Sequence, residues 1–287
     1  MPPNQVFAAV GACIYCGSTE SPLTDEHIIP FGLNGNLILP KASCKTCATI
    51  TGEIERFCLR PMLGDFRSTT GLRTRRKKTR PKTITVRHRD VRRGVEISED
   101  IRTDNYPRIA LGYCFPPPGI LYNGHPNAPI EGELMSGVLL SELDRIRKPG
   151  TELILKLGTF NALTFMRMLA KIGHAWAIAT LGRDAFTPLL PDLILGKNNT
   201  ARWLVGADPK AKNLPPNPAA AHDFGLEFMR VPGGTYLLAG IRLFAPVPMP
   251  KYHVVVAKCN LKLKARLFYQ AARHAIAAQK SAPEKFP

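Results

Sequence analysis

The sequence predicts an α+β protein in which a small cysteine-bearing module precedes a larger mixed domain. Three observations predict this class: two CxxC pairs near the N-terminus, a long apolar helical segment beyond the middle of the chain, and three strand-like segments after it. We expect three parts, namely a cysteine module (residues 1–70), a basic linker or arm (residues 71–93) and an α+β domain of unassigned role (residues 94–287).

Length and charge limit what the chain can do. Its 287 residues suffice for one large domain or two ordinary ones, and a hydrophobic content of 45% can build a core. Lys and Arg number 39 against 22 Asp and Glu, a formal charge of +17 that favours a polyanionic partner. The chain shows no apolar run of about 18 residues and no signal-peptide pattern. We therefore expect a cytoplasmic protein without a membrane partner, and a homo-oligomer is left open.

Four of the seven cysteines form the pairs Cys13/Cys16 and Cys44/Cys47. Each CxxC turn places two thiolates on one side of a tight loop, and two such turns complete a tetrahedral four-thiolate site. Free core cysteines or a redox pair are the alternative, but two matched pairs favour zinc. Because four thiolates leave no open position for water, the predicted zinc is structural. The 27 residues between Cys16 and Cys44 leave room for a hairpin.

The segment DEHIIP (Asp25–Pro30) lies between the two pairs. The motifs CIYCG, DEHIIP, an Asn followed by aliphatic residues, and CKTC resemble, in that order, the HNH endonuclease family over residues 11–60. The resemblance implies a zinc-braced, treble-clef-like ββα-metal fold and phosphodiester cleavage that leaves 5′-phosphate and 3′-hydroxyl ends. It also implies that His27 is the general base, that Glu26 holds a catalytic Mg²⁺ or Mn²⁺, and that Asn36 helps to orient the histidine.

The residue types support the same chemistry without the family. Phosphodiester hydrolysis needs an activated water, which a His of near-neutral pKa can supply, and a cation that offsets charge on the phosphoryl oxygens. Adjacent strand residues point to opposite faces, so Glu26 and His27 can meet one phosphate only if the strand ends or twists there. Pro30 and the Gly32/Gly35 loop favour such a bend. The alternative is that Glu26 and His27 only pack or bond within the module.

One position departs from the family pattern. Most members carry His or Asn directly after the last CxxC, where it completes the catalytic metal site, and here the residue is Ala48. The helix expected over residues 48–58 offers Thr51, Glu53 and Glu55 as oxygen donors. Glu55 is favoured because it lies two turns from Ala48 on the same face, although an ordinary solvated helix face is an equal alternative. Two functions stay open: a nuclease with a variant metal site, or a zinc-stabilised nucleic-acid-binding module that does not cut.

A basic stretch follows the cysteine module, with eleven Lys or Arg between residues 73 and 93. We expect non-specific, salt-dependent contact with nucleic acid, DNA being favoured, and a solvated linker is the alternative. The expected contact residues are Arg73, Arg75, Arg76, Lys77, Lys78 and Arg80. Within the same stretch, residues 83–88 alternate as a strand does.

The second half of the chain predicts a mixed domain. Residues 160–181 are apolar on most faces and predict a core helix that ends at Gly182. Residues 184–196 contain two prolines and predict a short kinked helix, and the basic tail from Leu261 has a helical pattern. Three strands are expected over residues 224–231, 235–245 and 252–259, the first two joined as a hairpin. His174 and His253 are expected to be core residues.

Overall fold

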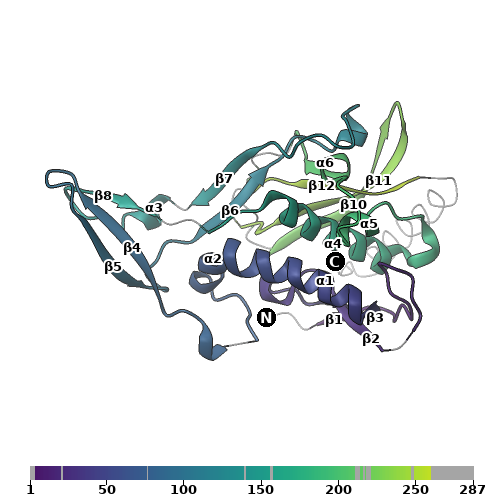
Figure 1. Cartoon of the computed structure of the whole chain (residues 1–287), viewed down its shortest axis with the longest axis horizontal. Coiled ribbons are helices and arrows are strands. Elements are labelled where there is room, and N and C mark those ends of the chain that lie inside the picture. The colour runs from purple at the N-terminus through teal and green to yellow at the C-terminus, as the bar shows by residue number, and fades with distance from the viewer. Residues whose placement is uncertain are drawn as a thin grey trace, which may run out of the picture.

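The computed structural model describes residues 4–20, 22–75, 77–138, 140–155, 158–210, 214–215, 217, 221–246 and 249–259. The predicted tail helix from Leu261 lies outside these residues. The cysteine module and a C-terminal sheet pack on opposite sides of a central helix, α4 (Ala162–Leu181), and a smaller sheet extends to one side (Figure 1).

The cysteine module contains a three-stranded sheet followed by helices. Its strand order is β1 (Gln5–Val6), β3 (Leu37–Cys44) and β2 (Leu23–His27), with β1 parallel and β2 antiparallel to β3. Helix α1 (Lys45–Phe57) follows β3 directly, continues through one π-helical turn (Cys58–Met62) and precedes α2 (Gly64–Thr69). Two antiparallel strands and then a helix is the element order that we expected for this part of the chain.

Helix α4 begins and ends at well-defined caps. The Asn161 side chain accepts a hydrogen bond from the Thr164 N–H at 2.9 Å, and Gly182 terminates the helix with a φ of 86°. The predicted core helix is therefore confirmed. Gly173 permits close packing on the C-terminal sheet, since a Cβ there would lie 3.0 Å from the Val254 side chain.

The C-terminal sheet is antiparallel throughout, and its strands confirm the predicted hairpin and third strand. Their order is β10 (His222–Val231), β11 (Gly234–Leu243), β12 (Tyr252–Lys258) and β9 (Val205–Ala207). In place of one kinked helix, the segment after α4 holds a 3-10 turn (Arg183–Ala185) and α5 (Pro191–Ile194), and α6 (Ala201–Leu204) leads into β9.

Between the cysteine module and α4 lie two further sheets. The first has the order β5 (Glu96–Arg102), β4 (Thr83–Asp90) and β8 (Thr151–Ile154). The second pairs β6 (Ile109–Cys114) with β7 (Glu133–Val138), and α3 (Leu140–Leu143) precedes β8. The boundary predicted at residue 94 falls in the turn between the paired strands β4 and β5, so the predicted linker and the predicted domain share a sheet.

One hydrophobic core joins the cysteine module to the C-terminal sheet. A single buried cluster includes Ile28, Leu39 and Ile54 of the cysteine module, Leu169 of α4 and Val254 of β12. A separate small cluster lies beneath β4 and contains Val86, Tyr106, Ile109 and Ile146. The cysteine module therefore shares its core with the rest of the chain and does not have a separate one.

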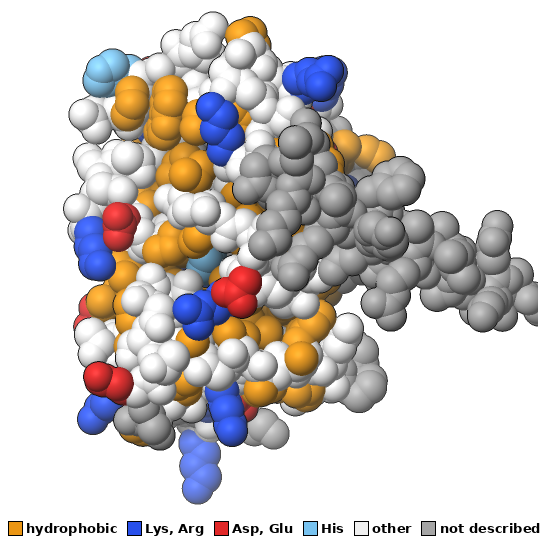
Figure 2. Space-filling model, turned by 90° about the vertical axis from the view of Figure 1, so that its right-hand side faces the viewer, with side chains coloured by type: hydrophobic (Ala, Val, Ile, Leu, Met, Phe, Trp, Pro, Cys, Tyr) orange, Lys and Arg blue, Asp and Glu red, His pale blue; other side chains and the backbone are white. Residues whose placement is uncertain are grey.

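One face of the molecule carries charged side chains at scattered positions. On the face at the right of Figure 1, single Lys, Arg, Asp and Glu side chains are scattered among hydrophobic ones (Figure 2). Among the described residues, no helix has the length and apolar character needed to cross a membrane.

Candidate functional site

The four paired cysteines lie together at one end of the cysteine module. Cys13 and Cys16 belong to a turn before β2, Cys44 ends β3 and Cys47 lies in the first turn of α1. Their sulfur atoms are all within 4.8 Å of one another, and the Cys16 and Cys44 sulfurs are 3.7 Å apart. A zinc tetrahedron with Zn–S bonds of about 2.3 Å has edges of about 3.8 Å. The cluster can therefore hold a metal such as zinc.

The local backbone and the chemistry of the thiols fit this assignment. Gly17 adopts a φ of 79°, which closes the first turn and lets its N–H bond the Cys13 carbonyl at 2.9 Å. Burial and the neighbouring thiols raise the pKa of Cys47, because sulfurs this close ionise together only when a cation compensates them. None of the four cysteines forms a disulfide.

Glu26 and His27 end strand β2, where the sequence predicted that the strand would end or twist. Their partners on β3 are Leu39 and Ile38, and β2 carries an irregularity between Thr24 and Glu26. The two side chains differ sharply in environment: Glu26 is 6% exposed and buried in the core, whereas His27 is half-buried.

His27 lies at the edge of the loop that follows β2. Its ring contacts Phe31 edge-on, with 5.9 Å between the ring centroids. Burial lowers the pKa of His27, and the positive charges of Lys171 and Arg75 add to the effect. The imidazole is therefore neutral at physiological pH, which is the form that can accept a proton.

Glu26 and Glu55 are brought together by a residue from α4. The Lys171 Nζ lies 2.6 Å from Glu26 Oε1 and 2.8 Å from Glu55 Oε1, and it also donates a hydrogen bond to the His27 carbonyl. Burial alone would lower the pKa of Lys171. The attraction of the Glu26 and Glu55 carboxylates is stronger than this effect, and it raises the pKa of Lys171 well above its usual range. Burial raises the pKa of Glu26, and Lys171 opposes that shift.

Glu26 and Glu55, which we call the carboxylate pair, are the residues that would have to hold a catalytic divalent ion. Mg²⁺ requires near-octahedral oxygen ligands at about 2.0–2.1 Å. Here the two carboxylate oxygens already bind an ammonium group, and Ala48 offers no donor. The Thr51 hydroxyl donates to the Cys47 carbonyl within α1, and Glu53 is exposed. The carboxylate pair as arranged here does not fit a Mg²⁺ or Mn²⁺ ion.

Asn36 directly precedes β3. Its carbonyl accepts a hydrogen bond from the Gln5 N–H at 2.8 Å, which fastens β1 to the sheet. The orienting role toward His27 that the resemblance implies for its side chain stays a prediction.

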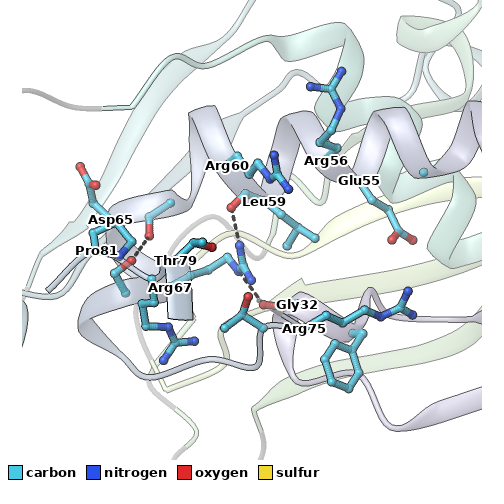
Figure 3. Close-up of a pocket in the computed structure, with 16 residues that line it drawn as sticks. Gly32, Glu55, Arg56, Leu59, Arg60, Asp65, Arg67, Arg75, Thr79 and Pro81 are labelled. Carbon is cyan, nitrogen blue, oxygen red and sulfur yellow. Dashed lines mark hydrogen bonds between the residues drawn. The ribbon is translucent and has the colours of Figure 1, made fainter. Parts of the chain in front are cut away.

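A cavity of about 770 Å³ opens beside this region, between the Phe31 loop, α1 and the basic stretch (Figure 3). Five arginines line it, and the two carboxylates in its wall are Glu55 and Asp65. We call it the arginine cavity, after Arg56, Arg60, Arg67, Arg75 and Arg80.

The five arginines differ in what holds them. Arg67 is fixed by hydrogen bonds to the carbonyls of Gly32, Leu59 and Arg73, so its role is structural. Among the described residues, Arg56 and Arg60 form no ion pair with a carboxylate, so their charge is available to an anion.

The predicted nucleic-acid contacts fall into three groups. Arg75 and Arg80 line the arginine cavity, and Arg73 and Arg75 lie over the Phe31 ring, 5.5 and 5.6 Å from its centroid. This part of the basic stretch therefore stays on the cysteine module. Lys78 is exposed. Arg76 and the side chain of Lys77 lie outside the described part of the chain.

Sequence reasoning missed two elements of the site. Arg56 of α1 and Arg60 of the π-helical turn that continues it are four residues apart, a spacing that could have been read as one charged helix face. Lys171 stands in a segment that is apolar on most faces, and a charge buried there requires a partner. Nothing local, however, identifies that partner as Glu26 or Glu55.

Comparison of the chain with protein-family models, with curated proteins and with solved structures gave no match. The resemblance to the HNH endonucleases therefore depends on the residues of this chain alone.

Proposed function

We propose that this protein is an HNH-type endonuclease that hydrolyses the phosphodiester backbone of nucleic acid, with DNA as the favoured substrate. One observation carries the proposal. A half-buried His27 of lowered pKa contacts Phe31, and Phe31 is also a wall of the arginine cavity. A candidate general base thus lies next to a candidate phosphate-binding surface.

In the proposed reaction, His27 and the arginines of the cavity have different roles. The neutral His27 imidazole takes a proton from a water molecule as the water oxygen bonds to phosphorus and the P–O3′ bond breaks. The departing 3′-oxygen takes a proton from solvent and becomes the 3′-hydroxyl. Arginine side chains such as Arg75 offset the charge that develops on the phosphoryl oxygens. By the resemblance, the products carry 5′-phosphate and 3′-hydroxyl ends.

The resemblance also implies Mg²⁺ or Mn²⁺, which would supply charge compensation at the phosphate when bound. Glu26 and Glu55 are bonded to Lys171 and do not provide a site for such an ion. Cleavage is therefore to be measured both with and without an added divalent ion.

A second candidate is a zinc-stabilised module that binds nucleic acid without cutting it. Two observations favour it: Ala48 replaces a metal ligand, and Lys171 neutralises the carboxylate pair. Binding in the arginine cavity is common to both candidates, so only cleavage distinguishes them.

Plasmid cleavage by the zinc-loaded protein tests the proposal, with Mg²⁺, with Mn²⁺ and without added divalent ion. We expect nicking or linearisation by the parent and by His125→Ala, a matched control in an exposed loop, and none by His27→Ala. Inactivity of all three proteins, with DNA still shifted on a gel, would leave the binding module. Cleavage by His27→Ala would exclude His27 as the base.

A further inference from the structure

Lys171 belongs to α4, but the groups that bind its ammonium belong to the cysteine module. It lies in the middle of α4, it is fully buried, and its nearest polar partners all belong to β2, the residues after β2 and α1. An ammonium group has three N–H donors. The Glu26 carboxylate, the Glu55 carboxylate and the His27 carbonyl are its three closest acceptors, one to match each donor, and the Ile28 carbonyl lies farther away at 3.5 Å.

This match suits an ammonium group and not a divalent ion. Mg²⁺ takes six oxygens in near-ideal octahedral geometry. The site offers two carboxylates and the backbone carbonyls of His27 and Ile28, the second at 3.5 Å from the Lys171 Nζ. A metal ion could bind these oxygens only if Lys171 left, and leaving would place its charge against the apolar residues around α4.

Lys171 also has an advantage over any ion from solution, because it is part of the chain. A covalently attached cation is present at the site at any metal concentration, since its binding is intramolecular. It balances the buried Glu26 carboxylate, which is costly to leave unpaired, and the partly exposed Glu55 carboxylate. In addition, its bond to the His27 carbonyl fixes the backbone of the candidate base.

We propose that Lys171 is the resident cation of the cysteine module, taking the position that a divalent ion would otherwise hold between Glu26 and Glu55. Lys171 is a positioning residue: it orders the carboxylate pair and the backbone of His27 and excludes Mg²⁺ or Mn²⁺ from these oxygens. This proposal concerns the cation and stands whether or not the module cuts nucleic acid.

Mn²⁺ binding to the full-length, zinc-loaded protein tests the proposal by electron paramagnetic resonance. We expect that Glu26→Gln and Glu55→Gln leave the Mn²⁺ binding of the wild-type protein unchanged. Lys171→Met removes the charge but keeps a similar side-chain length, and we expect it to gain one equivalent of Mn²⁺. Adding Glu26→Gln to this variant should abolish the gain. A purely structural Lys171 would give no such gain.

Lys251→Met is the matched control, because Lys251 pairs with Glu227 on the C-terminal sheet, away from the carboxylate pair. It should not gain Mn²⁺. The proposal is overturned if the wild-type protein binds one Mn²⁺ that Glu26→Gln or Glu55→Gln removes. It is equally overturned if Lys171→Met keeps its zinc and its fold yet gains no Mn²⁺. Should Lys171→Met not fold, Mn²⁺ bound by the wild-type protein and lost in Glu55→Gln would still overturn the proposal.

Discussion

Two of the histidines with lowered pKa values, His27 and His174, lie in different environments. His27 is half-buried between the positive charges of Lys171 and Arg75 and remains within reach of solvent. His174 is fully buried in α4, where its Nε2 lies 2.7 Å from the Ile14 carbonyl oxygen and therefore carries the proton that donates to it. The first arrangement suits proton transfer, whereas the second joins α4 to the cysteine-bearing turn.

Burial lowers the pKa of His174 to about 4, which makes it a source of acid sensitivity. The unfolded chain has an ordinary His pKa of about 6.5, so it binds more protons than the folded chain between these values. The contribution of buried, neutral His174 to the unfolding free energy is complete above pH about 6.5. It is lost as the pH falls toward 4, and the loss is on the order of 3 kcal/mol.

We expect His174→Gln to show a smaller decrease in unfolding free energy over this pH range than the wild-type protein. The amide can still donate to the Ile14 carbonyl but does not titrate. Urea unfolding at several pH values measures the difference. His222, whose pKa burial also lowers, leaves a residual slope in the variant. Parallel curves for the two proteins would contradict the assignment.

Among the elements, the loop between β2 and β3 is the tightest part of the site. A Cβ on Gly35 would lie 1.9 Å from the Ile29 carbonyl oxygen, a contact that only a backbone shift can relieve. We expect Gly35→Ala to lose on the order of 3 kcal/mol or more of unfolding free energy, as strained substitutions do.

Gly52 of α1 is the matched control, because a Cβ there meets nothing within 4 Å. Ala is the better helix former by about 1 kcal/mol, so Gly52→Ala should be neutral or stabilising. Urea midpoints of the two variants measure the contrast. A wild-type midpoint for Gly35→Ala would show that this loop is less rigid than its contacts indicate.

The cysteine cluster connects the first turn, β3 and α1, and we expect its metal to stabilise all three. Cys16→Ser should reduce the bound zinc and lower the melting temperature, since structural zinc contributes on the order of 10 kcal/mol to the folding of small modules. Metal analysis and thermal unfolding measure both effects. Cys259→Ser, outside the cluster, should keep its zinc. Equal zinc in the two variants would exclude the four-cysteine site.

At the scale of the whole molecule, the formal charge of +17 matters chiefly where it is concentrated. We expect Arg56→Ala and Arg75→Ala to weaken DNA binding several-fold and to reduce the slope of log affinity against log salt by about 1 each. Titrations at several salt concentrations measure this slope. Arg230→Ala removes the same charge from an exposed position on β10 and should change neither quantity. Equal effects of all three would indicate general electrostatic attraction.

The parts that the sequence predicted are those encoded locally. The CxxC spacing places Cys13 near Cys16 whatever the rest of the chain does, and the apolar pattern with Gly182 marks the end of α4. Lys171 illustrates what could not be predicted. Its backbone partner, His27, lies 144 residues earlier, and such pairing depends on how the whole core assembles. The shared core and the arginine cavity escaped prediction for the same reason.

The pairing of Lys171 with Glu26 and Glu55 has a consequence for synthesis of the chain. A ribosome makes the cysteine module first, and domains generally fold in that order. This module, however, can pair its two carboxylates with the Lys171 ammonium group only after α4 has emerged. Until then the nascent chain holds the cysteine module with these two carboxylates hydrated. The candidate site is therefore completed only after α4 has emerged, when more than half of the 287 residues have been made.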